Sequence, residues 1–131
     1  MSESVATRLE TFFADGAGGV VTAYLFGSAA RNELRPDSDV DVGVLFAEAC
    51  AEGTDACLAL EERLERLIGR RTQAVDLERA PADLVQRVLR DGILLLDRDP
   101  AARVRFEVRR RNEWFDLQPL LRAYRRAPGA A

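Results

Sequence analysis

The chain has 131 residues, enough for one folded domain with a modest hydrophobic core. It is 47% hydrophobic and 31% charged, as in ordinary globular proteins, and no apolar run approaches the length of a membrane span. Histidine is absent and every basic residue is arginine, which excludes Cys/His zinc sites, histidine triads, and lysine Schiff-base or P-loop chemistry. The two cysteines make no disulfide framework and the N-terminus is not a signal peptide, so we expect a cytoplasmic protein without membrane contact.

Charge is unevenly distributed along the chain. Residues 1–97 carry ten arginines against eighteen acidic residues, a balance of −8, whereas residues 98–131 carry nine against four, a balance of +5. A uniformly basic nucleic-acid binder would not show this asymmetry. Most of the C-terminal arginines alternate with acidic residues, as on a solvated helix face. Direct nucleic-acid binding is therefore not expected, and partner docking is the other role left open for this segment.

The first half of the chain alternates helical and strand patterns. Apolar residues at helical spacing predict a helix over residues 5–13, and the following DGAGG ends it. The β-branched and aromatic residues 20–26 predict a strand. Residues 28–34 suit one or two helical turns, and residues 35–38 a loop, because proline disfavours helix in the residue before it. Strict alternation over residues 39–46 predicts a half-buried strand.

The second half repeats this alternation. One helix is expected from Thr54 to a stop at Gly69, and another from Pro81 to Gly92. Residues 72–78 and 92–97 read as short strands.

A longer amphipathic segment closes the chain over about residues 99–126, where Pro119 is expected to interrupt the helix. Residues 127–131 should fray. The alternating order predicts a single α/β (α+β) domain over residues 1–126, built in layers.

A row of aspartates marks the second expected strand. Asp37, Asp39 and Asp41 occupy alternate positions, and in a strand Asp39, Asp41 and Gly43 point to the same face. Two carboxylates beside a residue without a side chain would form a concave anionic floor. Like charges this close raise each other's pKa unless a cation compensates, and hard oxygen ligands suit Mg²⁺.

A third acid in the next strand is a candidate for the same face. Asp76 lies between Val75 and Leu77, which we expect to face the core, so Asp76 faces the other way. If the two strands are neighbours, Asp76 then joins Asp39 and Asp41.

Gly27 and Ser28 lie where the first strand ends. Glycine allows close approach of a ligand, and backbone N–H groups at a helix start favour phosphate. The Ser28 hydroxyl adds a donor, and Arg31 follows about one helical turn later, where it could contact the same phosphates.

Two plainer interpretations remain open. Aspartates are common in turns, so the row could be a polar loop that leads into a strand. Asp37, Asp39, Asp41 and Glu48 also match positions 1, 3, 5 and 12 of a calcium loop. However, the glycine required at position 6 is missing there, since Val42 occupies it.

The spacing of these residues resembles a known family signature. Gly27-Ser28, ten further residues and then Asp39-Val40-Asp41 are similar to the polymerase-β-like nucleotidyltransferases. The longer string GSAARNELRPDSDVDVGVLF resembles the minimal (MNT) branch, which often pairs with HEPN toxins in toxin–antitoxin operons. VDL fits the place of the third family aspartate, and residues 84–126 resemble the closing strand and C-terminal helix. One departure is Asn32, where the family usually has glycine; asparagine tolerates the same left-handed turn.

The resemblance implies a polymerase-β-like fold, with a small mixed sheet flanked by helices and a C-terminal helix. It further implies two Mg²⁺ ions and ATP as substrate. Asp39 and Asp41 would ligate both metals, Asp76 would ligate the catalytic metal and help to activate the acceptor, and Gly27, Ser28 and Arg31 would bind phosphates. The MNT antitoxins transfer AMP to a tyrosine of the HEPN toxin, so the implied partner is such a toxin in a hetero-oligomer.

Two other functions remain in competition. A nucleotidyltransferase acting on a small molecule such as an aminoglycoside generally carries an added C-terminal domain, and only about 35 residues follow the last expected strand. A non-catalytic antitoxin that binds its toxin by contact alone should have lost some of the site residues. Trp114 and Phe115 either anchor a partner or cover the sheet, and Cys50 and Cys57 are expected near the core.

Overall fold

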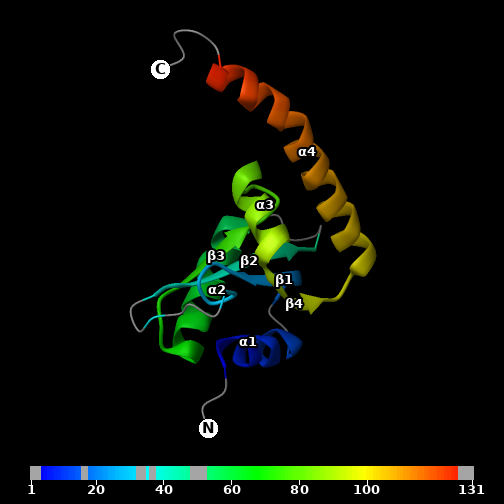
Figure 1. Cartoon of the computed structure of the whole chain (residues 1–131). Helices are drawn as coiled ribbons and strands as arrows, with labels where there is room; N and C mark the ends of the chain where they lie inside the picture. The colour runs from blue at the N-terminus through cyan, green and yellow to red at the C-terminus, as the bar shows by residue number, and fades with distance from the viewer. Residues whose placement is uncertain (1–3, 16–17, 32–34, 36–37, 48–52, 127–131) are drawn as a thin grey trace.

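The computed structural model describes residues 4–15, 18–31, 35, 38–47 and 53–126. Helices alternate with strands along this part of the chain, except that β2 follows β1 directly (Figure 1). Their bounds are α1 Val5–Ala14, β1 Val20–Phe26, β2 Val40–Phe46, α2 Gly53–Ile68, β3 Thr72–Asp76, α3 Ala82–Asp91, β4 Ile93–Asp97 and α4 Pro100–Arg126. The strands and helices expected from the sequence are therefore present; the turn after β1 and the expected break in α4 are discussed below.

The strands form one mixed sheet in the order β3-β2-β1-β4. β1 is antiparallel to both β2 and β4, and β2 is parallel to β3. The parallel pair is joined by α2, as a parallel connection requires a crossover, whereas β1 and β2 need only the loop between them. This arrangement confirms the predicted α/β fold with a small mixed sheet.

Helices cover both faces of the sheet, so the sheet has two hydrophobic cores. One core lies under α1 and α2 and takes the side chains of Val40, Val42 and Val44 from β2. The other lies under α3 and the start of α4 and includes Tyr24 and Leu45. A polar side chain on β2 therefore cannot turn outward to solvent except at the end of the strand.

The edge strand β3 is protected by the helix that precedes it. The backbone N–H groups of Thr72 and Ala74 donate to the carboxylates of Glu65 and Glu61, at 3.2 Å and 2.9 Å. Both glutamates belong to α2, which packs along β3. These two hydrogen bonds occupy N–H donors on the outer edge of β3 that could otherwise pair with a strand of another chain. They also hold β3 in place beside β2.

The long helix α4 is anchored at its start and extends away from the sheet at its end (Figure 1). Asp99 caps it by accepting from the backbone N–H of Ala102 at 3.1 Å. Arg103 then bridges Asp97 of β4 at 3.0 Å and Glu107 at 2.8 Å, and Phe106 is only 2% exposed in the second core. None of the described helices, α4 included, is long and apolar enough to cross a membrane.

The prediction that Pro119 interrupts the last helix was wrong. α4 runs without a break from Pro100 to Arg126, with Pro119 inside it. Proline removes one donor and crowds the carbonyl of the residue four positions earlier, Phe115. Both residues are exposed, so water can hydrate that carbonyl, and the cost is too small to end the helix here.

Candidate active site

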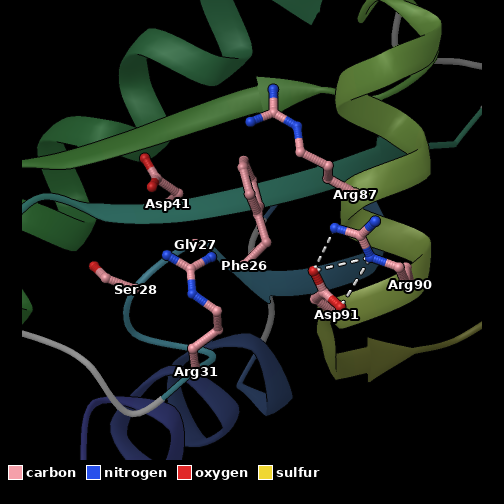
Figure 2. Close-up of a pocket in the computed structure, with 8 residues that line it drawn as sticks. All are labelled: Phe26, Gly27, Ser28, Arg31, Asp41, Arg87, Arg90 and Asp91. Atoms are coloured by element: carbon pink, nitrogen blue, oxygen red, sulfur yellow. Dashed lines mark hydrogen bonds and ion pairs between the residues drawn. The ribbon is translucent and has the colours of Figure 1, made fainter.

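A cavity of about 350 Å³ lies where β1 ends, beside β2 and α3 (Figure 2). It collects four of the six site residues expected from the sequence: Gly27, Ser28, Arg31 and Asp41. The remaining lining residues are Phe26, Arg87, Arg90 and Asp91. The loop after β1, the central strand β2 and the end of α3 thus meet at one place.

Gly27 allows a very close approach between its backbone and Asp41. Phe26 and Asp41 are register partners across β1 and β2, so Gly27 lies next to the Asp41 side chain. Gly27 has φ +73°, and a Cβ added there would lie 2.6 Å from Asp41 Oδ2. Only glycine meets both demands without strain. The carboxylate is consequently held directly against the chain that would carry a phosphate.

The chain after Gly27 forms a turn through Arg31. The backbone N–H of Arg31 donates to the Gly27 carbonyl at 3.2 Å, which closes one helical turn, but no helix follows within the described residues. A phosphate here would therefore meet turn N–H groups and the Ser28 hydroxyl, without the dipole of a full helix. Arg31 points its guanidinium into the cavity (Figure 2). Asn32, and the rest of the predicted helical turns, lie outside the described residues.

Burial and a neighbouring charge both act on Asp41. Burial raises the pKa of the Asp41 carboxyl, and the Asp39 carboxylate raises it further. Asp39 immediately precedes β2 and is half-buried, although it does not line the cavity itself. Two acids this close favour a bound cation, which would offset both the desolvation and the repulsion.

Gly43 does not extend an anionic floor. A Cβ added at Gly43 would lie 2.9 Å from Leu77 Cδ2, so the space beside its backbone is filled by the fully buried Leu77. The predicted concave floor of two carboxylates and a glycine was therefore wrong in this part. The glycine that matters beside the carboxylates is Gly27.

Asp76 lies on the opposite face of the sheet from Asp41. In the parallel pairing of β2 and β3, Asp76 is the partner of Val44, which points into the core under α1 and α2. Its carboxylate accepts from the Glu78 backbone N–H at 3.1 Å and lies 3.9 Å from Arg79. The pKa of the Cys57 thiol on α2 is raised to about 11 by burial and then by Asp76.

The expectation that Asp76 joins Asp39 and Asp41 was therefore wrong. Val75 and Leu77 do face a core, as expected, but it is the core on the same side as Asp41. Because the sheet has two cores, facing a core does not tell which side a residue is on. Cys57 is buried, as expected, whereas Asp37, Glu48 and Cys50 lie outside the described residues.

Sequence reasoning missed the basic residues that α3 brings to the cavity. Arg90 makes an ion pair with Asp91 at 2.9 Å, and that pair lies across the cavity from Asp41 (Figure 2). Arg87 is exposed and makes no hydrogen bond or ion pair with the other described residues. Arg87 and Arg90 share one helix face at i, i+3 spacing, but nothing in the sequence places that face beside Gly27.

The donor set fits one divalent ion with a nucleotide. Mg²⁺ commonly takes one or two protein carboxylates together with substrate phosphates, and Asp39 and Asp41 can supply them. Within the described residues, no group of three or more acidic or cysteine side chains is placed to hold a metal. The calcium-loop interpretation fails, because residues 40–46 form a central strand instead of a loop. Carboxylates on one side and arginines on the other suit a polyphosphate bound together with a cation.

These features fit a site for nucleotide phosphates, and a family comparison agrees. The model of the polymerase beta nucleotidyltransferase family matches residues 9–101, which span the sheet, the cavity and α3. The chain belongs to this family. No match to the chain is found among curated protein sequences.

Solved structures show the same fold. A chain of a toxin–antitoxin complex with AMP-PNP is 24% identical with a TM-score of 0.75, over 90% of this chain and 93% of that one. A complex of tri-AMPylated Shewanella oneidensis HEPN toxin with MNT antitoxin is 24% identical with a TM-score of 0.69, over 91% of each chain. A protein described as a minimal nucleotidyltransferase is 33% identical with a TM-score of 0.54, over 67% of this chain and 86% of that one.

The contact between Gly27 and Asp41 can be measured by comparing two glycines. We expect Gly69→Ala to cost about 1–2 kcal/mol of unfolding free energy, because φ is +75° there and no atom lies within 4 Å of the new Cβ. Gly27→Ala should cost more, since it adds a clash with Asp41 Oδ2 to the same backbone strain. Urea unfolding of both variants tests this. Equal losses of unfolding free energy in the two variants would contradict the close approach. Adding Asp41→Ala to Gly27→Ala should reduce its loss to that of Gly69→Ala, because the clash with Asp41 Oδ2 is then absent.

The raised pKa of Asp41 predicts a pH-dependent effect of Asp41→Asn. The folded state holds the neutral carboxyl better than the unfolded state does, so the wild type loses stability as the pH rises through the folded pKa. In EDTA at neutral pH, Asp41→Asn should therefore melt at a higher temperature than the wild type. The gap should shrink as the pH falls toward about 4, near the pKa of a free aspartate. The exposed Asp116→Asn serves as the control, and a difference in melting temperature between Asp41→Asn and the wild type that does not change with pH would refute the assignment.

Proposed function

We propose that this chain is a magnesium-dependent nucleotidyltransferase that transfers AMP from ATP to a tyrosine of a HEPN toxin. The observation that carries this proposal is the Asp41 carboxylate held against the Gly27 backbone in a cavity rimmed by arginines. Support comes from the similar structures, one bound to AMP-PNP and one containing a tri-AMPylated toxin.

Five of the site residues expected from the sequence have tasks in this reaction. Asp39 and Asp41 are the residues that would hold the cation beside the triphosphate, where its positive charge would offset the negative charge of the phosphates. Gly27, Ser28 and Arg31 bind the β- and γ-phosphates through turn N–H groups, a hydroxyl and a guanidinium. The tyrosine oxygen attacks the α-phosphorus and loses its proton to water. The bond to the β-phosphate oxygen breaks, and pyrophosphate leaves.

The exposed face of α4 supports docking of a protein partner. Val104, Val108 and Phe115 share one helix face and are 48%, 51% and 68% exposed. A soluble chain gains nothing from an apolar stripe facing water, and such stripes mark interaction sites. Phe115 therefore does not cover the sheet, and we assign the stripe to the toxin.

The transfer reaction is tested with the purified chain, Mg-ATP and the product of the neighbouring gene as the candidate toxin. Intact mass of the toxin should rise by whole AMP units with the wild type. Asp39→Asn and Asp41→Asn should slow the transfer about 100-fold or more, the scale of losing a preorganised charged group. Asp116→Asn, exposed on α4, serves as the matched control.

Other outcomes favour the competing functions. A toxin that is neutralised without any mass change, equally by the wild type and Asp41→Asn, would indicate a non-catalytic antitoxin. AMP transfer to an aminoglycoside and not to the toxin would indicate a small-molecule enzyme.

The docking face is tested separately from catalysis. Val108→Asp and Phe115→Asp place a charge in the apolar stripe and should abolish co-purification with the toxin. Mg-ATP binding by calorimetry should stay unchanged, because the cavity contains no α4 residue. Ala123→Asp introduces the same charge at an exposed position of α4 about two turns beyond Phe115, and it should leave the complex intact. Co-purification of Phe115→Asp at the wild-type level would exclude this face as the interface.

A further inference from the structure

We propose that Gln73 takes the third place in the metal site, and that the chain consequently holds one divalent ion beside its nucleotide instead of two. This inference rests on the proposed function and concerns the metal count of the same site. Gln73, which the sheet places beside Asp41, takes the position that the sequence analysis assigned to Asp76.

The strand register puts Gln73 next to Asp41. Asp41 on β2 has Phe26 as its partner on β1 and Gln73 as its partner on β3. Partners in a parallel ladder point to the same face of the sheet. Gln73 is exposed, and its side chain makes no hydrogen bond with the other described residues. Its amide is therefore on the face where Asp41 lies, beside the residues that line the cavity but not among them.

The alternation along β3 is fixed by burial at every other position. Thr72 and Ala74 are buried on the side of α1 and α2, and Asp76 follows them to that side. Leu77, just after the strand, fills the space beside Gly43 on the opposite side. A slip of one residue would reverse all of these positions, so Asp76 cannot reach Asp41 without dismantling both cores.

No other described acid takes the third place. Asp91 also lines the cavity, but Arg90 holds it through both carboxylate oxygens, at 2.9–3.2 Å. Within the described residues, no group of three acidic side chains is arranged around a possible metal position.

The difference between an amide and a carboxylate decides how many ions the site can hold. Two divalent ions about 4 Å apart repel each other, and two-metal sites need several carboxylates to offset this. The amide oxygen of Gln73 is neutral, so the protein offers only the two charges of Asp39 and Asp41. This charge suits one ion shared with the triphosphate.

Metal counting tests the inference without relying on turnover. The chain is dialysed to equilibrium against Mn²⁺ and saturating AMP-PNP, and the excess Mn²⁺ and nucleotide in the protein chamber are measured. The wild type should hold one Mn²⁺ per bound nucleotide. Gln73→Glu, which has the same length and adds a charge, should double this ratio and show Mn–Mn coupling by electron paramagnetic resonance. Gln73→Ala and Asp76→Asn should leave the ratio at one.

The outcomes separate this inference from the proposed function. Two Mn²⁺ per nucleotide in the wild type would overturn the inference and leave the proposed function standing. If Asp76→Asn then lowered this ratio to one, Asp76 would be the third metal ligand. A ratio of one in both Gln73→Glu and the shorter Gln73→Asp would also overturn it. Absence of any Mn²⁺-dependent nucleotide binding in the wild type would instead overturn the proposed function itself.

Discussion

The contact between the Asp41 carboxylate and the Gly27 backbone is the constraint on which the rest of the site depends. β2 is the central strand of a sheet covered on both faces, so a charge on it is costly unless it emerges where a neighbouring strand ends. β1 ends at Phe26, directly opposite Asp41, and the chain then turns at a glycine. The carboxylate meets bare backbone instead of a side chain. One short stretch of chain thereby brings together an anionic group that needs a cation and N–H groups that suit a phosphate.

The sequence was informative where local periodicity decides the outcome. The alternation of residues 39–46 located β2 and its buried valines, and the glycine and aspartate spacing located the cavity's floor. It failed where two strands must be related to each other. Alternation shows that Asp76 and Leu77 point to opposite sides, but the side of Asp41 is set by a register over many residues. In a sheet that is covered on one face only, the apolar residues identify the buried face. Here apolar residues are buried on both faces, so they do not tell on which face a given residue lies.

Long-range packing explains what could not be foreseen around the cavity. α3 lies against the sheet through Val85 and Val88, and this packing turns Arg87 and Arg90 toward the end of β1. A helix pattern predicts which residues share a face, but not which distant loop that face will meet. The prediction that Pro119 interrupts α4 was wrong for a different reason. The free-energy cost of an interior proline depends on whether water can reach the carbonyl that loses its hydrogen bond.

The same packing links the exposed face of α4 to the cavity. Arg103 ties the start of α4 to Asp97 of β4, and Arg110 donates to the carbonyl of Ala80, just before α3. α3 then carries Arg87 and Arg90 to the rim. α4, which carries the apolar stripe, thus packs against the helix that lines the cavity, and ion pairs and hydrogen bonds fix its position. The toxin proposed above as the acceptor would therefore dock on a helix that packs against the one carrying Arg87 and Arg90.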